Sequence, residues 1–280
     1  MTIEATLRDA QISLAKFVDS GEAKLEAQLL LQSVLNVNRA WLISHQNDAL
    51  EANVHAAYRA LINRRLNGEP IAYILGYREF YGLKLKVTPA TLIPRPDTET
   101  LVDAALAKIP LQKNLTICDL GTGSGVIALA IAKHRPHSHV TAVDTSEDAL
   151  KIAYENAQSL QITNIKFVQS NWFGALHNQL FDVIVSNPPY IEQNDLHLKQ
   201  GDLRFEPTSA LASGQDGLDD IRNIITNTPQ HLNPHGWLLL EHGYNQAEQV
   251  AALLKQAGFS QISHAQDLAG IHRVTFGCIA

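Results

Sequence analysis

The sequence predicts an α/β fold in which a mostly parallel sheet follows a small helical N-terminal domain. After residue 110, strand-like and helix-like patterns alternate, which is typical of parallel sheets with helices on both faces. Before residue 75, apolar residues instead recur at helical spacing. The length of 280 residues fits two domains, at roughly 150 residues per domain.

The N-terminal domain is expected over residues 1–77, as helices that include LEAQLLLQSVL and HAAYRALINRRL. Residues 78–97 are expected to form a linker that starts with a β-hairpin. The stretch REFYGLKLKVT alternates in polarity and carries Gly82 at its turn. Asp97 or Thr98 is the expected N-cap of the helix that follows.

The remaining residues, 98–280, carry the expected sheet. Its strands are predicted at LTICDL, HVTAVD, IKFVQ, FDVIVS, GWLLLEH, FSQISHA and HRVTFGC. Its helices are predicted at VIALAIAKH, EDALKIAYENAQ, LDDIRNIITNTPQHL and AEQVAALLKQAG. Ligands of such sheets bind beyond the carboxyl ends of the strands, so the loops after the strands are expected to carry the site.

Charge and composition exclude several classes of protein. The formal charge is −6, with 22 basic and 28 acidic residues, which argues against broad nucleic-acid binding. Only 10 basic and 9 acidic residues lie in the first 90, so the acidic excess lies in the rest. The two cysteines, Cys118 and Cys278, form neither a disulfide framework nor a metal-finger pattern. Neither a signal peptide nor a long apolar run is present, and we expect a cytoplasmic protein.

A glycine-rich segment, Asp119 to Gly125, directly follows the first predicted strand of the sheet. Its glycines at 121, 123 and 125 allow the backbone to approach a ligand at the start of the next helix. The spacing matches neither the dinucleotide fingerprint, which would need glycine at Val126, nor a P-loop, which would need lysine. An ordinary tight turn between strand and helix is the alternative.

Asp144 ends the next predicted strand, 23 positions after Gly121. A carboxylate at this place can accept two hydrogen bonds from a ribose diol. It could also cap the helix after Thr145 and Ser146. Together, the glycine loop and Asp144 favour a cofactor that contains adenosine, without choosing among such cofactors.

The tetrapeptide Asn187-Pro188-Pro189-Tyr190 follows the strand FDVIVS. Asn187 offers a carbonyl oxygen, and the two prolines leave the Pro188 carbonyl free to accept a hydrogen bond. Tyr190 adds a flat ring. Two acceptors beside an aromatic plane suit a planar –NH2 group, either an amide or an exocyclic amine. A rigid exit loop with a buried tyrosine is the alternative.

With these motifs the chain resembles the S-adenosylmethionine-dependent class I methyltransferases, and more narrowly the release-factor glutamine methyltransferases (PrmC/HemK family). The narrower likeness rests on LIPRPDTE at 92–99, GEPIAYILG at 68–76, FEP at 205–207, DGLD at 216–219 and GWLLLEHG at 236–243. It implies a Rossmann-like class I methyltransferase sheet. It also implies methyl transfer from S-adenosylmethionine, leaving S-adenosylhomocysteine, to the glutamine of the Gly-Gly-Gln loop in class I peptide chain release factors. The N-terminal domain would dock the partner protein, and neither a metal, a membrane nor a nucleic-acid substrate is expected.

The resemblance assigns roles to individual residues. Cofactor contacts are expected from Asp119, Gly121, Thr122, Gly123, Ser124, Gly125, Asp144, Asn171, Trp172 and Asn187. Catalysis is expected from Asn187, Pro188 and Tyr190, and substrate binding from these three with Pro189. The family commonly has an acidic residue near the adenine amine where this chain has Asn171, whose amide oxygen accepts without charge. Trp172 is expected to pack against the cofactor or to be a plain core residue.

Three other functions remain open from the residues. They are methylation of a ribosomal-protein glutamine, methylation of an adenine amine in DNA or RNA, and cofactor binding without catalysis. Arg95 faces the cleft or ties the linker to the sheet domain. Glu206 and Glu241 serve as caps, ion-pair partners or site residues.

Overall fold

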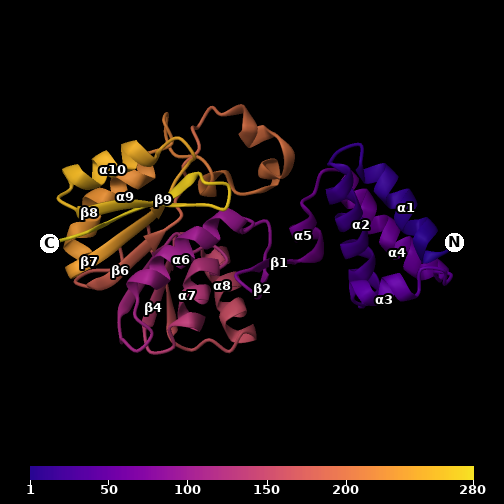
Figure 1. Ribbon diagram of the computed structural model, residues 1–280, viewed down its shortest axis with the longest axis horizontal. Coiled ribbons are helices and arrows are strands. Elements are labelled where there is room, and N and C mark those ends of the chain that lie inside the picture. The colour runs from indigo at the N-terminus through magenta and orange to yellow at the C-terminus, as the bar shows by residue number, and fades with distance from the viewer. The chain divides into compact units, whose positions relative to one another are not determined.

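The computed structural model describes residues 1–280, which form two compact units, Met1–Gly76 and Tyr77–Ala280 (Figure 1). Each unit has a hydrophobic core of its own. None of the helices in either unit combines the length and the apolar character that a membrane span requires.

The first unit is built from helices, three of which start at a side chain that accepts backbone N–H bonds. The helices are α1 (Ile3–Leu14), α2 (Ser20–Leu35), α3 (Arg39–Ser44), α4 (Ala52–Leu66) and α5 (Ile71–Leu75). Thr2 caps α1, Asp19 caps α2 and Asn38 caps α3. Such a cap gives a partner to N–H groups that have none inside the helix and stabilises it by about 1 kcal/mol.

The core of the first unit lies among α1, α2 and α4. Tyr58 of α4 is almost fully buried and donates its hydroxyl to the carbonyl of Ala27 in α2 at 3.0 Å. Arg65 of α4 and Glu26 of α2 form a buried ion pair, with Nε 2.9 Å from Oε2. Loss of either partner would leave a buried charge, so this pair fixes how α2 and α4 meet.

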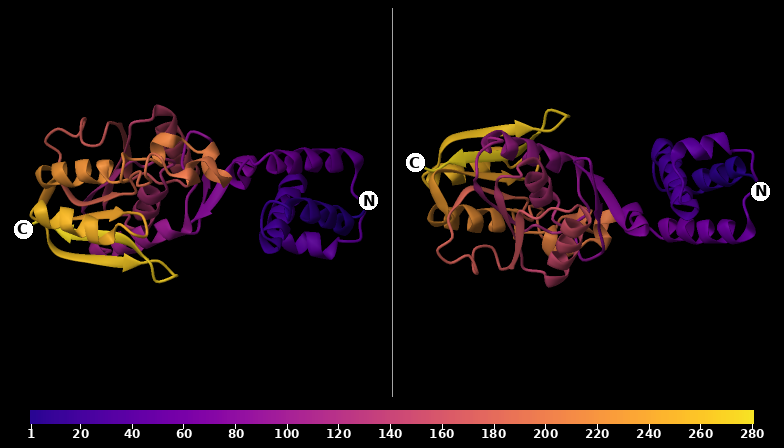
Figure 2. Two further views of the ribbon diagram at one scale, coloured as in Figure 1. Left: turned by 90° about the horizontal axis from the view of Figure 1, so that it is seen from above. Right: turned by 90° about the horizontal axis from the view of Figure 1, so that it is seen from below.

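The second unit contains a seven-stranded sheet in the order β5-β4-β3-β6-β7-β9-β8. Its strands are β3 (Thr116–Leu120), β4 (His139–Asp144), β5 (Ile165–Gln169), β6 (Phe181–Ser186), β7 (Leu232–Glu241), β8 (Ser260–Gln266) and β9 (His272–Cys278). The first five strands in that order are parallel, and β9 pairs antiparallel with β7 and β8 (Figure 2, yellow). The predicted mostly parallel α/β sheet is confirmed.

Helices cover both faces of this sheet, and the sheet separates two cores. The first core includes α6 (Glu99–Lys108), α7 (Val126–His134) and α8 (Glu147–Ser159), and the second includes α9 (Asp219–Asn227) and α10 (Ala247–Gln256). Side chains of β6 alternate between them, because Val183 and Val185 join the first core and Ile184 joins the second. Short 3-10 helices lie in the connections: η1 (Pro96–Thr98), η2 (Leu196–Lys199), η3 (Gly201–Phe205), η4 (Thr208–Ala210) and η5 (Thr228–His231).

A β-hairpin begins the second unit, with strands β1 (Tyr77–Phe80) and β2 (Leu83–Lys86). Tyr81 and Gly82 both have positive φ, as the two-residue turns of tight hairpins require. Leu85 is fully buried in the first core, and the N–H of Lys86 donates to Asn156 Oδ1 on α8 at 2.7 Å. The segment expected as a linker therefore packs into the second unit.

Candidate active site

The loops at the carboxyl ends of β3, β4 and β6 surround a cavity of about 290 Å³. Seven predicted site residues line it: Gly121, Gly123, Asp144, Asn171, Trp172, Asn187 and Pro189. Further wall residues come from elsewhere in the unit: Ala90, Thr91, Leu92, Pro207, Ser209, Ala210 and Asp220. This is the edge at which open parallel sheets bind their ligands.

The glycine loop leaves β3 with its three glycines in the left-handed region, at φ +75° for Gly121, +55° for Gly123 and +86° for Gly125. A Cβ on Gly125 would lie 3.0 Å from the Cβ of Ala153 in α8. A Cβ on Gly123 would meet nothing within 4 Å. Gly125 thus allows the loop to pack against α8, whereas Gly123 lets the backbone approach a ligand in the cavity.

Asp119, Thr122 and Ser124 support the glycine loop and do not line the cavity. Asp119 Oδ2 accepts from Thr122 Oγ1 at 2.6 Å and from the N–H of Ala128 at 3.2 Å. Its Oδ1 is buried without a partner, and burial raises the pKa of Asp119 to about 7. The carbonyl of Ser124 accepts from Asn156 at 2.9 Å. In this arrangement the three residues shape the loop.

Asp144 ends β4 with its carboxylate against the glycine loop. Oδ2 accepts from the N–H of Gly123 at 2.8 Å, and Oδ1 accepts from the N–H of Ser146 at 2.9 Å. The N-cap of α8 is Ser146, whose hydroxyl accepts from Ala149, so Asp144 is not the cap. Burial raises the pKa of Asp144, and the N–H donors oppose that rise. Each carboxylate oxygen can accept a second bond, which leaves acceptors for a diol.

Trp172 forms the wall of the cavity beside the glycine loop. Its ring would lie 3.4 Å from a Cβ placed on Gly121, so the two residues fit closely. The φ of Trp172 is +48°, an uncommon value for a bulky side chain and a sign of a constrained position. Asn171 is exposed in the same wall, where its amide is accessible to a ligand.

Asn187 and Pro189 line the cavity directly after β6, whereas Pro188 and Tyr190 do not. Asn187 Nδ2 donates to Thr98 Oγ1 at 3.2 Å, which leaves Oδ1 as an acceptor. The carbonyl of Pro188 accepts no backbone hydrogen bond within the chain. The tetrapeptide therefore offers two unpaired carbonyl oxygens at this edge of the sheet.

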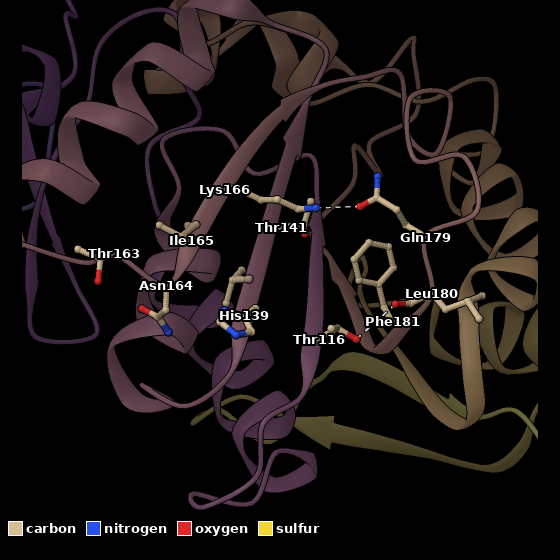
Figure 3. A pocket seen from close by; sticks show the side chains of 11 residues that line it. Thr116, His139, Thr141, Thr163, Asn164, Ile165, Lys166, Gln179, Leu180 and Phe181 are labelled. Carbon is tan, nitrogen blue, oxygen red and sulfur yellow. Dashed lines mark hydrogen bonds between the residues drawn. The ribbon is translucent and has the colours of Figure 1, made fainter.

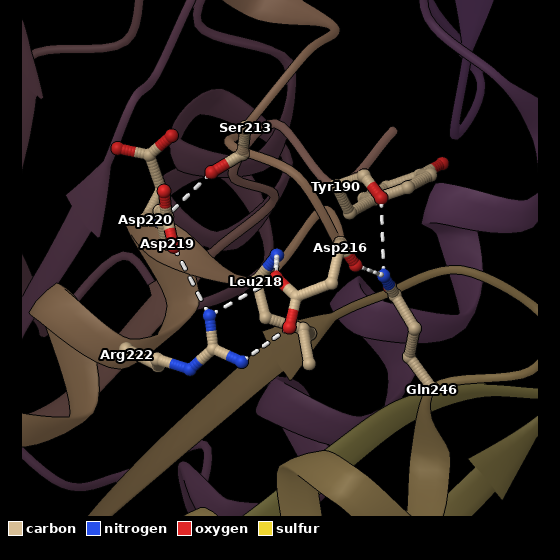
Figure 4. Close-up of polar contacts among 8 residues, drawn as sticks. All are labelled: Tyr190, Ser213, Asp216, Leu218, Asp219, Asp220, Arg222 and Gln246. Atoms are coloured by element: carbon tan, nitrogen blue, oxygen red, sulfur yellow. Dashed lines mark hydrogen bonds and ion pairs between the residues drawn. The ribbon is translucent and has the colours of Figure 1, made fainter. Parts of the chain in front are cut away.

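Tyr190 is held by residues far along the chain. Its ring packs against the second core, and its hydroxyl donates to Glu241 Oε1 at 3.4 Å. Its carbonyl accepts from Gln246 Nε2 at 3.1 Å (Figure 4). A Cβ on Gly217 would lie 2.2 Å from this carbonyl, so only glycine fits there. Burial raises the pKa of Tyr190, which keeps its hydroxyl a donor.

Thr98 and Glu241 differ from what the sequence predicts. Thr98 occupies the N-cap position of α6, but its side chain makes no cap bond to that helix. Its hydroxyl oxygen instead accepts from Asn187 Nδ2 at 3.2 Å, and the side chain lowers the pKa of Glu241. Glu241 is 1% exposed at the end of β7, its Oε2 has no partner, and burial raises its pKa to about 7. No local pattern could pair these residues, because they lie on distant segments.

Arg95 ties the segment before α6 to the long loop after β6. Its guanidinium pairs with Glu206, whose Oε2 also accepts from the N–H of Ile93 at 2.9 Å. Pro207 follows this glutamate and Leu92 precedes Ile93, and both line the cavity. The pair therefore holds two parts of the cavity wall together.

A second hollow, of about 490 Å³, lies at the opposite edge of the sheet (Figure 3). Thr116, His139 and Lys166 line it at the amino ends of β3, β4 and β5, and Lys166 Nζ donates to Gln179 Oε1 at 2.9 Å. It contains no part of the glycine loop or the tetrapeptide, so we place the candidate active site at the carboxyl edge.

Two family models match the chain, one in each unit. A PrmC N-terminal domain matches residues 5–76, and a methyltransferase domain matches residues 111–272. Among solved structures, a methyltransferase from Pyrococcus furiosus aligns with a TM-score of 0.53 at 18% identity, covering 77% of this chain and 96% of that one. At that identity the alignment supports the fold alone.

Three relatives that share one name align with almost the whole chain. A release factor glutamine methyltransferase from Salmonella typhimurium is 48% identical over 92% of this chain and 93% of its own length. Proteins of the same name from Vibrio cholerae and Pseudomonas aeruginosa are 48% and 47% identical. Each alignment covers 99% of this chain, with 96% of the first protein and 98% of the second.

Proposed function

The chain belongs to the release factor glutamine methyltransferases, and from that membership we propose that it methylates the glutamine of the Gly-Gly-Gln loop in class I peptide chain release factors. The methyl group goes from S-adenosylmethionine to the side-chain amide nitrogen. The observation that carries the proposal is the pair of unpaired oxygens directly after β6, Asn187 Oδ1 and the Pro188 carbonyl. Asn187 lines the same cavity as Gly121, Gly123 and Asp144.

The cavity fits the methyl donor. Gly123 leaves its wall open where a Cβ would otherwise project, and Asp144 keeps acceptors for the ribose hydroxyls. Trp172 supplies a flat surface, and Asn171 or Asp220 can accept from an adenine amine at the same wall. When bound, the donor supplies an electrophilic methyl group on a positively charged sulfur and leaves as S-adenosylhomocysteine. Since that sulfur already activates the methyl carbon, the proposal requires no metal ion.

The tetrapeptide would hold and activate the amide nitrogen. A glutamine amide is a weak nucleophile because its lone pair is delocalised into the carbonyl group. Hydrogen bonds from its N–H groups to Asn187 Oδ1 and the Pro188 carbonyl would increase electron density on nitrogen. These bonds would strengthen as positive charge develops, and they would also align nitrogen with the methyl carbon. No strong base is needed, because the methylated nitrogen becomes acidic.

The substrate is a protein rather than a nucleic acid in this proposal. The acidic excess lies in the part of the chain that carries the site, and like charge would repel a phosphate backbone. The helical first unit would bind the body of the release factor. In this proposal the chain acts in the cytoplasm, in translation termination.

The test is incubation with S-adenosylmethionine labelled in its methyl group and three substrates: a purified class I release factor, its Gly-Gly-Gln glutamine variant, and duplex DNA. We expect label on the wild-type factor alone. Label on DNA would favour an adenine-amine methyltransferase, and label on the variant factor would place the methyl group elsewhere.

A further inference from the structure

A buried chain of hydrogen bonds links the tetrapeptide to β7. Asn187 Nδ2 donates to Thr98 Oγ1 at 3.2 Å, and the Thr98 side chain in turn lowers the pKa of Glu241, so it lies beside that carboxylate. Tyr190 reaches the same glutamate directly, with its hydroxyl 3.4 Å from Oε1. Thr98 is 2% exposed and Glu241 is 1% exposed, so water does not compete for these bonds. Neither residue lines the cavity.

We propose that Thr98 and Glu241 are positioning residues that decide which end of the Asn187 amide faces the substrate. This inference rests on the proposed function, because it concerns the acceptor that would hold the substrate amide. An asparagine amide has an acceptor at one end and donors at the other, and the two ends have nearly the same shape. Only the orientation with Oδ1 toward the substrate can accept from a glutamine N–H.

The single proton of the Thr98 hydroxyl determines that orientation of the Asn187 amide. An ionised carboxylate only accepts hydrogen bonds, so Thr98 must give its single hydroxyl proton to Glu241. Its oxygen then faces Asn187 with lone pairs alone. The NH2 end of the amide can bond to those lone pairs, whereas Oδ1 would be repelled by them. Glu241 thus orients Asn187 through Thr98, without contact with the substrate.

Protonation of Glu241 would remove this constraint. A neutral Glu241 can donate to Thr98, which then becomes free to donate to Asn187 Oδ1 and hold the amide in the unproductive orientation. Oε2 has no partner in the chain, and burial raises the pKa of Glu241 to about 7. Asp97 raises this pKa further, while Thr98, Tyr190 and Arg273 lower it. Arg273 is itself paired with Asp97 at 3.1 Å. Only ionised Glu241 holds Asn187 in the productive orientation, so the rate of methyl transfer should fall as the pH drops through this pKa.

Thr98→Val and Thr98→Ser test the inference, because valine keeps the shape of threonine and serine keeps its hydroxyl. Each variant is assayed for methyl transfer to a purified release factor and for S-adenosylmethionine affinity by calorimetry. We expect Thr98→Val to lower kcat about 10-fold to 100-fold, the scale for a misplaced reacting group. Cofactor affinity should stay within about twofold, and Thr98→Ser should recover most of kcat.

The pH profile of kcat shows whether Thr98 and Glu241 position Asn187 or only stabilise the fold. The wild-type chain should lose activity on the acid side near neutral pH, and Glu241→Gln, which has no titrating proton, should lack that limb. A normal kcat in Thr98→Val would overturn the inference, and so would an acid limb that persists in Glu241→Gln. If Thr98→Val does not fold, as judged by circular dichroism, Thr98→Ser and the Glu241→Gln profile still decide. A wild-type chain inactive on the release factor would instead contradict the proposed function.

Discussion

The glycine loop after β3 and the tetrapeptide after β6 lie at the same edge of the sheet, but different bonds hold them in place. In the glycine loop, Asp119 bonds to residues 3 and 9 positions away. In the tetrapeptide, Asn187 bonds to a residue 89 positions away, and the Tyr190 hydroxyl to one 51 positions away. The glycine loop also bonds to Asp144, 21 positions from Gly123, and to Asn156, 32 positions from Ser124, so its partners lie on the next strand of the chain and the helix after it. The tetrapeptide depends on segments that lie much farther away along the chain.

This difference predicts which substitutions should affect turnover and which should affect cofactor affinity or folding. Side chains of the tetrapeptide should control turnover, because they would hold the reacting nitrogen. Residues of the glycine loop and Asp144 should control cofactor affinity and stability, because they shape the cavity and pack against α8.

The largest effect is expected at Asn187. Asn187→Ala removes an acceptor used in the transition state, and kcat should fall about 100-fold to 1000-fold. S-adenosylmethionine affinity, measured by calorimetry, should fall much less than kcat. Gln193→Ala is the matched control, since this amide lies exposed in the same loop and should retain full activity. Near-normal turnover in Asn187→Ala would refute the proposed mechanism.

A smaller effect, on cofactor affinity rather than on turnover, is expected at Asp144. Asp144→Asn removes the charge that would accept from the ribose hydroxyls, so the Kd of S-adenosylmethionine should rise about 10-fold to 100-fold. At saturating cofactor, kcat should remain close to wild type. Asp148→Asn removes an exposed charge from the adjacent helix and should leave the Kd unchanged. If kcat fell while the Kd did not change, Asp144 would belong with the chemistry.

Two glycine substitutions separate the role of the loop in packing against α8 from its role in cofactor binding. Gly125→Ala forces a Cβ to within 3.0 Å of Ala153 and should lower the free energy of unfolding by about 1–3 kcal/mol in urea. The Cβ added in Gly123→Ala would point into open space, so this variant should lose less stability. It should nevertheless bind the cofactor more weakly. Equal losses of stability in the two variants would contradict this division.

A further effect is expected in the pH dependence of stability. Burial raises the pKa of Asp119 to about 7, so the folded chain holds this proton more tightly than the unfolded chain does. The stabilisation is complete below the ordinary aspartate pKa of about 4 and is lost as pH rises through about 7. Asp119→Asn should weaken this dependence, as measured by urea unfolding at pH 5 and pH 8. An identical pH dependence in both chains would show that Asp119 does not contribute.

The same distinction explains how far the sequence could predict the site. The strand LTICDL, the glycines after it and Asp144 form a local pattern, and the structure places Gly121, Gly123 and Asp144 in one cavity. The sequence predicts Asp97 or Thr98 as the cap of the next helix, and Thr98 does occupy that position, although its side chain makes no cap bond. Its use by Asn187 and Glu241 depends on the meeting of β6, β7 and α6 in space. For Arg95 the sequence leaves two roles open, facing the cleft or tying the linker to the sheet domain, and the structure shows the second through its ion pair with Glu206. The partner itself lies 111 positions away, so no local pattern could name it.

The close fit of Trp172 against Gly121 provides an optical reporter. The chain has three tryptophans, and Trp172 is the one that lines the cavity, since Trp41 belongs to the first unit and Trp237 lies on β7 beneath the ammonium group of Lys108. In a chain with Trp41→Phe and Trp237→Phe, the remaining indole emission would come from the cavity wall alone. Occupancy of the cavity could then be followed by fluorescence in real time, separately from turnover.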